Sequence, residues 1–406
     1  MSTTVKTATD VRPFQVDVPE EQIDNLRRRI TATRWPSKEL VQDRAQGVQL
    51  GTLQELARYW STEYDFGRVE ARLNALPQYT TEIDGVDMHF IHVKSEHENA
   101  LPLIMTHGWP GSVIEMIDSV GPLTDPTAHG GTAEDGFDLV IPSLPGYGFS
   151  DQPTSAGWDP GRTARAWAEL MNRLGYTRYV AQGGDVGAGV TDAMAIQAPD
   201  GLAGIHLNFL RRPPLEVVAV LLGRAPVPPG LTDAERAALA AFGAQARKGY
   251  NAEQSQAPQT IGYSLTDSPA GLAAWMLDHD VDSYKKISRA FVEGHLVGGL
   301  TRDRILDNIT LYWLTNTATS AARMYWEGAR STAAAAAAGH APPEVSLPVA
   351  FTVFPDEIFR APRSWAEKVY PNLVYFHQAD RGGHFAAWEE PALFTEELRA
   401  GFRSLR

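Results

Sequence analysis

A carboxylate in a glycine-rich turn is the residue of this chain best placed to act as a nucleophile. Residues 183–187 read Gly-Gly-Asp-Val-Gly and follow the apolar segment Tyr179–Ala181. Glycines two positions before and after Asp185 would let a tight strand-to-helix turn lift its side chain into a pocket. A carboxylate there attacks an electrophilic sp³ carbon and becomes the acid half of an ester, whereas a serine attacks acyl carbons. The pattern disfavours ordinary esterase or protease activity, although a glycine-rich loop with a chance aspartate would look the same.

An acid and a histidine follow Asp185 in the order that α/β-hydrolases use, which is nucleophile, acid and then histidine. His384 lies just beyond the apolar segment Leu373–Phe376, and two glycines directly before it would let the backbone bend toward Asp185. Most histidines of a chain are structural, but the position and order of His384 favour a base. The acid is Glu357 or Asp356, because spacing alone cannot separate adjacent carboxylates.

A second glycine-containing loop could stabilise an oxyanion. Residues 107–111 read His-Gly-Trp-Pro-Gly and follow the apolar residues 104–106. We predict an oxyanion hole made by the backbone N–H groups of Trp109 and of Val186, the residue after the nucleophile. His107 is predicted to be a structural hydrogen-bonding residue rather than a second base.

The elements that must position these residues follow an α/β pattern. A period-two pattern flanks Asp84-Gly85 and predicts a hairpin, and short apolar runs separated by helical segments then predict buried parallel strands. The predicted strands are Leu101–Met105, Phe137–Ile141, Tyr179–Ala181, Ile205–Phe209, Val349–Val353 and Leu373–Tyr375. Between Phe209 and Val349 the strand signals stop. A capping box at Thr232 and a helix start at Thr301 indicate that an inserted helical lid lies there.

This pattern predicts an α/β-hydrolase fold with a mostly parallel central sheet, an inserted helical lid and an N-terminal helical extension. The predicted division of the chain is an N-terminal helical extension (1–79), the first part of the core (80–210), the helical lid (211–346) and the C-terminal part of the core (347–406).

Composition narrows the classes of partner. The 406 residues include 36 basic and 49 acidic side chains, and the net charge of −13 argues against binding to nucleic acid or an anionic membrane. There is no cysteine, and His89 and His92 face different sides of a strand without a third ligand, so we predict no metal site. Residues Met1–Glu20 lack the apolar core of a signal peptide, and no stretch of roughly twenty apolar residues could span a bilayer. We expect a soluble cytoplasmic protein without a membrane anchor, and a homodimer is compatible with the sequence.

Four motifs together closely resemble the microsomal-type epoxide hydrolases. They are residues 107–112 (His-Gly-Trp-Pro-Gly-Ser), 183–187 (Gly-Gly-Asp-Val-Gly), 267–272 (Asp-Ser-Pro-Ala-Gly-Leu) and 381–391 (Arg-Gly-Gly-His-Phe-Ala-Ala-Trp-Glu-Glu-Pro). Residues 34–36 (Arg-Trp-Pro) also resemble the N-terminal region of that family, so the resemblance covers nearly the whole chain. The chain differs from the membrane-bound members in lacking an N-terminal anchor, and in this it resembles a soluble bacterial-type member of the family.

The resemblance implies a hydrolase acting on ether bonds, which converts an epoxide and water to a vicinal diol without a cofactor or metal. It implies that Asp185 is the nucleophile and forms a hydroxyalkyl ester, which water activated by His384 then hydrolyses. Glu357 is implied as the orienting acid, because residues 354–357 match the family's Phe-Pro-x-Glu context. Two lid tyrosines, Tyr250 and Tyr325, are implied to hold the epoxide oxygen. The residues implied to contact the substrate are Trp109, Tyr250 and Tyr325.

Two other functions use the same residues. A haloalkane dehalogenase also has an aspartate nucleophile, and it would need N–H donors for the halide, of which the Trp109 indole could be one. A hydrolase-fold protein that binds a ligand without catalysis is the alternative outside enzymes. The sequence does not identify the epoxide, although lid aromatics suggest a large pocket; these are Tyr263, Trp275, Tyr312 and Trp313.

Overall fold

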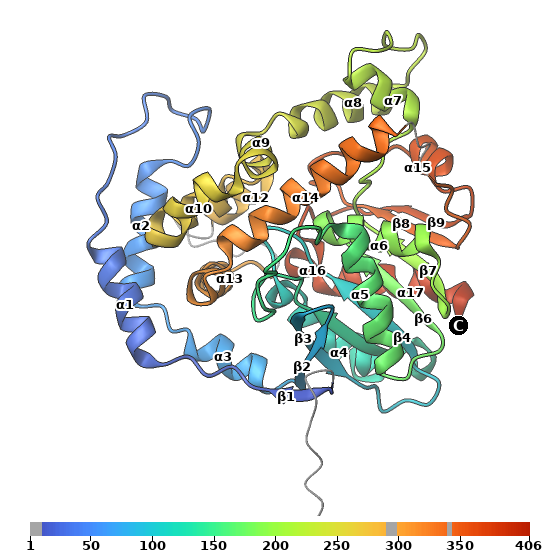
Figure 1. Ribbon diagram of the computed structural model, residues 1–406, viewed down its shortest axis with the longest axis horizontal. Helices are drawn as coiled ribbons and strands as arrows, with labels where there is room; N and C mark the ends of the chain where they lie inside the picture. The colour runs from blue at the N-terminus through green and yellow to red at the C-terminus, as the bar shows by residue number, and fades with distance from the viewer. Residues whose placement is uncertain (1–9, 290–298, 339–342) are drawn as a thin grey trace, which may run out of the picture.

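A mixed β-sheet forms the centre of the computed structural model, which describes residues 10–289, 299–338 and 343–406 (Figure 1). Its strand order is β1-β2-β3-β5-β4-β6-β7-β8-β9. Strands β1, β2, β3 and β5 pair antiparallel in that order, and the pairs from β5 through β4 to β9 are parallel. The strands are β1 (Arg12–Phe14), β2 (Gln78–Ile83), β3 (Val86–Val93), β4 (Leu101–Thr106), β5 (Phe137–Pro142), β6 (Tyr179–Gly183), β7 (Leu202–Leu207), β8 (Val349–Val353) and β9 (Leu373–Gln378). The predicted α/β-hydrolase fold with a mostly parallel sheet is confirmed.

The predicted hairpin connects β2 and β3. Ile83 pairs with Val86, and the two residues between them, Asp84 and Gly85, have φ angles of 56° and 80°. A two-residue turn with positive φ at both positions matches the twist of the two strands that it connects. Asp and Gly are favoured at such positions, which explains this pair.

The sequence predicted a helical N-terminal extension, but the segment is not wholly helical. It contains α1 (Glu20–Thr31), α2 (Leu50–Thr62) and α3 (Gly67–Asn74), but also β1, which pairs with β2 at the edge of the sheet. Three residues are too few to show a period-two pattern, and Pro13 within them argues against a strand anywhere except at an edge. Residues 1–9 of the predicted extension lie outside the described residues.

Every helix or strand that the structure describes between β7 and β8, where the lid was predicted, is a helix (Figure 1). Thr232 caps α8 in a reciprocal capping box with Glu235, and Thr301 caps α13, as the sequence indicated. The helices are α7 (Leu215–Leu221), α8 (Asp233–Ala246), α9 (Gly249–Gln256), α10 (Pro258–Asp267), α11 (Pro269–Leu277), α12 (Val281–Ser288), α13 (Arg302–Thr315) and α14 (Ala318–Ala337). Residues 290–298 and 339–342 of this region lie outside the described residues.

The N-terminal helices contact the lid at α13. Three side chains of the α2 region donate hydrogen bonds to α13: Tyr59 to Asp303 (2.7 Å), Trp60 to Thr310 (2.9 Å) and Tyr64 to Asp307 (2.8 Å). Because Trp60 and Tyr64 are buried, these bonds fix the position of α13 relative to the extension.

Further helices cover the parallel strands. Helix α5 packs against α6, which contacts β4, β6 and β7, while α17 packs against α4 and contacts β7, β8 and β9. Nearly every residue of β4 to β8 is buried, as expected for parallel strands covered on both faces. These helices are α4 (Ile117–Thr124), α5 (Pro160–Arg173), α6 (Asp185–Gln197), α15 (Arg363–Val369), α16 (Ala386–Glu389) and α17 (Pro391–Phe402).

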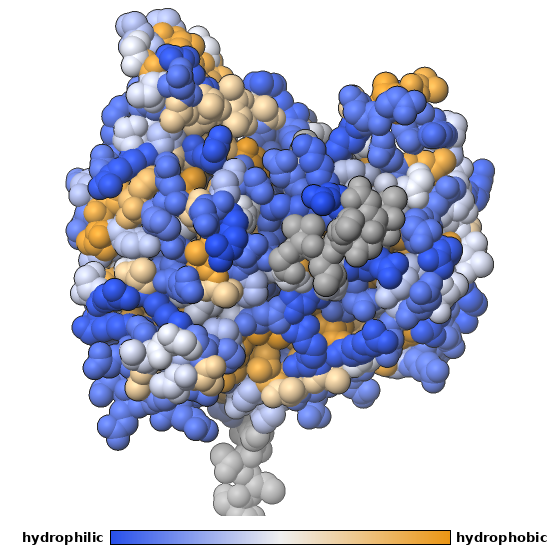
Figure 2. Space-filling view, turned by 180° about the vertical axis from the view of Figure 1, so that it is seen from behind, coloured by the Kyte–Doolittle hydropathy of each residue, from blue (hydrophilic) through white to orange (hydrophobic). Residues whose placement is uncertain are grey.

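The surface contains no extended apolar region on the face shown in Figure 2, where hydrophilic residues predominate and apolar ones form small separate patches. Among the described residues, no helix combines the length and apolar character needed to cross a bilayer.

Candidate active site

Asp185 sits in a strained turn between β6 and α6. Its φ angle is 46°, in the left-handed region that non-glycine residues rarely adopt, which costs about 1–3 kcal/mol. A Cβ on Gly183 would collide with the carbonyl oxygen of Gly187, and one on Gly187 with the carbonyl oxygen of Thr106. The two flanking glycines are therefore required sterically, because the turn presses β6, α6 and β4 together.

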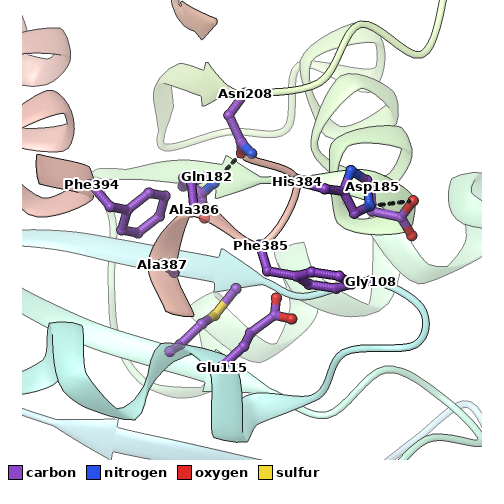
Figure 3. A pocket seen from close by; sticks show the side chains of 12 residues that line it. Gly108, Glu115, Gln182, Asp185, Asn208, His384, Phe385, Ala386, Ala387 and Phe394 are labelled. Carbon is purple, nitrogen blue, oxygen red and sulfur yellow. Dashed lines mark hydrogen bonds and ion pairs between the residues drawn. The ribbon is translucent and has the colours of Figure 1, made fainter. Parts of the chain in front are cut away.

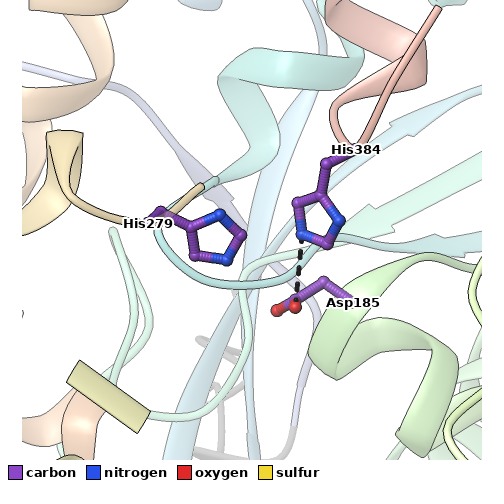
Figure 4. A group of neighbouring side chains, drawn as sticks. All are labelled: Asp185, His279 and His384. Carbon is purple, nitrogen blue, oxygen red and sulfur yellow. Dashed lines mark ion pairs between the residues drawn. The ribbon is translucent and has the colours of Figure 1, made fainter. Parts of the chain in front are cut away.

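Three chain segments that are far apart in sequence bring Glu357, His384 and Asp185 together. His384 Nε2 lies 3.3 Å from Asp185 Oδ2 (Figure 4). His384 Nδ1 lies 2.5 Å from Glu357 Oε1. The loops after β8 and β9 are joined by a backbone bridge between Asp356 and Gly383, so the next residue of each loop, Glu357 and His384, lies beside the other. All three side chains are buried.

The competing carboxylate points elsewhere. Asp356 Oδ2 lies 3.2 Å from Lys286 Nζ, and its side chain is 47% exposed. The residue beside His384 is therefore Glu357, and Asp356 contributes its backbone to the bridge.

The charges of these groups depend on one another. Burial would lower the pKa of His384, but the charge of Glu357 and hydrogen bonds to Asp185 and Glu357 raise it well above its usual range. Burial would likewise raise the pKa of Asp185, but the hydrogen bond and charge of His384 lower it. Both directions favour an ion pair between an Asp185 carboxylate and a protonated His384.

The loop after β4 provides a donor to the nucleophile. The N–H of Trp109 donates to Asp185 Oδ1 at 2.9 Å. Val186 is the second residue of α6, so its N–H has no acceptor within the helix. His107 accepts a hydrogen bond from the N–H of Leu144 at Nε2 (3.1 Å), and burial lowers its pKa to about 4, which fits the predicted structural role.

The two predicted lid tyrosines face Trp109. The ring centroid of Tyr250, in α9, lies 4.9 Å from that of Trp109, and the centroid of Tyr325, in α14, lies 6.0 Å from it. The two tyrosine rings are 6.3 Å apart. Burial, and next the charge of Asp185, raise the pKa of both phenols well above the usual range, so both are protonated donors.

The other lid aromatics that the sequence analysis named as pocket residues lie in different environments. Tyr263 is 72% exposed, Tyr312 donates to the carbonyl of Gly111 (2.7 Å), and the indole of Trp275 donates to Gln254 (3.0 Å). Aromatic residues at helical spacing serve packing here, and the rings around Asp185 come from loops as well as helices.

A small cavity lies beside Asp185 and His384 and also contains a buried acid (Figure 3). The space open to the centre of a water molecule is about 20 Å³, which is enough for one water. Glu115, in the short 3-10 helix Val113–Met116 (η1), lines it, and burial raises the pKa of this side chain from 4.5 to about 8. Near neutral pH Glu115 is mostly protonated.

We expect Glu115→Gln to stabilise the protein at pH 8 but not at pH 5. An acid whose pKa is higher in the folded state retains a proton that the unfolded chain has lost, so the free energy of unfolding falls as pH rises from about 4.5 to about 8. The loss is at most about 3–5 kcal/mol, and glutamine avoids it. Urea unfolding at the two pH values measures the effect, with the exposed residue Glu98, replaced as Glu98→Gln, as control. An equal change at both pH values would contradict a buried, protonated Glu115.

A second histidine, which the sequence analysis did not identify, also faces the nucleophile. His279 belongs to the loop between α11 and α12, and ligand-type atoms of Asp185, His279 and His384 all lie within 4.8 Å of one another (Figure 4). Two imidazoles and a carboxylate could hold a metal such as Zn²⁺, although Asp185 and His384 already interact with each other. Only the pairing of His279 with the acid that follows it could have drawn attention to this residue.

The chain shares its architecture and sequence with known proteins. Residues 11–116 match the family described as the epoxide hydrolase N terminus, and residues 102–246 match the alpha/beta hydrolase fold. The chain is 52% identical, over 98% of its length and 86% of the relative, to a Stigmatella aurantiaca protein provisionally named an epoxide hydrolase. It is 35% identical to Epoxide hydrolase 1 of Sus scrofa, over 96% of this chain and 88% of that protein.

Solved structures agree with these matches. The juvenile hormone epoxide hydrolase of the silkworm Bombyx mori superimposes with a TM-score of 0.83 at 30% identity, covering 98% of this chain and 96% of that one. The epoxide hydrolase of Aspergillus niger gives a TM-score of 0.80 at 30% identity, with 98% and 97% covered. The chain thus shares its overall architecture with these structures over nearly its whole length, and it belongs to the epoxide hydrolase family.

Proposed function

We propose that the protein converts an epoxide to a vicinal diol through a covalent ester on Asp185. The observation that carries this proposal is the buried Asp185 carboxylate, which lies 3.3 Å from His384 on one side while two protonated tyrosines stand over the Trp109 loop. A carboxylate, a base and two acids are the groups that opening a strained ether and hydrolysing the product require.

The first step forms the ester. Asp185 Oδ2 attacks a ring carbon, the carbon–oxygen bond of the epoxide breaks, and the oxygen leaves as an alkoxide. An alkoxide is far too basic to persist near neutral pH, and a phenol, which is a stronger acid than an aliphatic alcohol, can protonate it. Tyr250 and Tyr325 supply this proton, and the imidazolium proton of His384 replaces it.

Ester formation also prepares the base. Asp185 carries no charge in the ester, so part of what raises the pKa of His384 disappears, and the imidazole is left neutral. Glu357 fixes its orientation through Nδ1, which leaves Nε2 as the base. The electrostatics thus favour an acid at His384 before ring opening and a base after it.

The second step hydrolyses the ester. His384 Nε2 takes a proton from water, and the water oxygen attacks Cγ of Asp185. The tetrahedral oxyanion accepts hydrogen bonds from the N–H groups of Trp109 and Val186, where one such donor contributes roughly 3 kcal/mol. The alkyl oxygen leaves with the proton from His384, and the proton remaining on Asp185 returns His384 to the imidazolium. These steps balance without a metal or an organic cofactor.

Isotope labelling tests the ester directly. In a single turnover with excess enzyme in ¹⁸O-water, we expect a diol that is mostly unlabelled, because its new oxygen comes from Asp185. Mass spectrometry of the diol and of the peptide containing Asp185 measures where the label goes. Enzyme labelled by many turnovers and transferred to ordinary water is the control and should then yield a labelled diol. Full labelling of the diol in the first turnover would refute the ester.

The tyrosines also separate this function from dehalogenation. A halide leaves without a proton, so two protonated phenols beside the nucleophile favour an oxygen leaving group over a halogen. Release of halide from a chloroalkane without diol formation from styrene oxide would favour a dehalogenase.

A panel of aryl, alkyl and terpenoid epoxides, with chiral analysis of the diols, would define the substrate class.

A further inference from the structure

Two carboxylate–imidazole pairs, one from the core and one from the lid, converge on Asp185. The core pair is Glu357 with His384. In the lid pair, His279 Nδ1 lies 3.1 Å from Asp280 Oδ2, and Asp280 Oδ1 accepts the N–H of Ser283 at 2.7 Å. Asp280 is thereby held as the cap of α12, and the His279 ring, 2% exposed, is fixed over the nucleophile.

The bonding of His279 defines which nitrogen is free. A carboxylate can only accept, so Nδ1 carries the proton that it donates to Asp280. Because Nδ1–H is directed at Asp280, Nε2 is the ring nitrogen left to accept a hydrogen bond, and burial, which lowers the pKa of His279 although Asp280 opposes this, agrees with that assignment. Nε2 is buried and has no hydrogen-bond partner among the described residues. A buried acceptor of this kind needs a donor.

The spacing of the two imidazoles fits one water molecule. One ligand-type atom from each of His279, His384 and Asp185 lies within 4.8 Å of the others, which sets an upper limit on the separation that a bridging water must span. A tetrahedral water that donates hydrogen bonds of about 2.8 Å to two acceptors holds them about 4.6 Å apart. The lone pairs of such a water are directed away from both rings. Asp185 is the third group beside this water.

We propose that His279 is a second catalytic histidine of the hydrolysis step: its Nε2 accepts a hydrogen bond from the water that His384 deprotonates and holds that water against Cγ of Asp185. The proposal rests on the ester mechanism above. One water hydrogen goes to His384 and then to the leaving alkyl oxygen. The other stays on the attacking oxygen, bonded to His279, until the diol has left and His384 takes it.

A pair of variants separates the acceptor from the packing of the ring. His279→Phe keeps a planar ring beside His384, Tyr250 and Trp109 but has no acceptor. His279→Gln carries an amide oxygen at the reach of Nε2. Rapid quenching and mass spectrometry of the Asp185 peptide would give the rates of ester formation and ester decay for each.

We expect the phenylalanine variant to form the ester within about threefold of the wild-type rate and to hydrolyse it about 10- to 100-fold more slowly, so that the ester accumulates. The glutamine variant should recover most of the hydrolysis rate. A chelator should leave wild-type rates unchanged, because the proposal puts water and not a metal ion among these atoms.

Three outcomes would overturn the role of His279: equal slowing of both steps, unchanged hydrolysis in the phenylalanine variant, or a glutamine variant no better than phenylalanine. Loss of wild-type activity on chelation would overturn it too. Thermal unfolding checks the fold, and His279→Leu, which also lacks an acceptor, replaces the phenylalanine variant if that protein is unfolded. Failure of the ester mechanism itself would look different, because the wild-type protein would then form no ester on Asp185.

Discussion

His384→Gln should leave a protein that reacts with its substrate once and then stops. Ester formation needs the carboxylate of Asp185 and the tyrosine protons, whereas hydrolysis needs the base. We expect steady-state diol formation to fall about 10³-fold, in the range that removal of a general base causes. The Asp185 peptide should gain the mass of one epoxide per protein molecule, as measured by denaturing mass spectrometry.

Two adjacent acids provide a matched control for this prediction. Glu357→Gln removes the carboxylate 2.5 Å from His384 Nδ1 and should also slow hydrolysis strongly, because the charge that holds the imidazole is lost. Asp356→Asn alters the carboxylate that pairs with Lys286 and should leave the rate near the wild-type value. A His384→Gln protein that turns over normally, or an Asp356→Asn protein as impaired as Glu357→Gln, would contradict the roles proposed here.

The parts of the site that the sequence predicted are those that depend on short stretches of chain. The turn at Asp185 needs glycine at 183 and 187 because of collisions within the turn and with one neighbouring strand, and this leaves a local pattern. The order of nucleophile, acid and histidine follows from the order of the strands, since each residue lies just after a carboxyl end. Glycine at 382, where φ is 93°, likewise marks the bend before His384.

Other features depend on partners that are distant in sequence. Asp356 and Glu357 are distinguished by Lys286, which belongs to the lid and pairs with Asp356 only in the folded protein. His279 meets His384 because α11 and α12 bring their connecting loop over the core, and no spacing in the sequence records that approach. Tyr263 is an aromatic residue of the kind that often lines a pocket, but its side chain is exposed on the outer side of its helix. Local patterns thus predicted the turn at Asp185 better than its surroundings in the lid.

The largest effect on the first step is expected from removing both lid hydroxyls. Charge leaves Asp185 as it develops on the epoxide oxygen, so donors beside that oxygen stabilise the transition state more than the ground state. While Asp185 is charged it raises the pKa of both phenols, and this influence ends as the ester forms. Each phenol therefore becomes a better acid at the moment when a proton is needed.

Tyr250→Phe combined with Tyr325→Phe should slow ester formation about 10⁴-fold, since loss of one donor to a developing oxyanion costs about 10²–10³-fold. Each single variant should lose less, because the remaining phenol can still donate. Single-turnover consumption of epoxide measures this rate, and Tyr263→Phe, on the exposed face of the same lid, is the control for tyrosine loss. Both tyrosine rings pack against aromatic rings, and phenylalanine preserves this packing, so a stable double variant that opens epoxides at a near-normal rate would mean that the alkoxide obtains its proton elsewhere. Slow opening followed by normal decay of whatever ester forms would instead assign the tyrosines to the first step alone, because hydrolysis draws its proton transfers from His384.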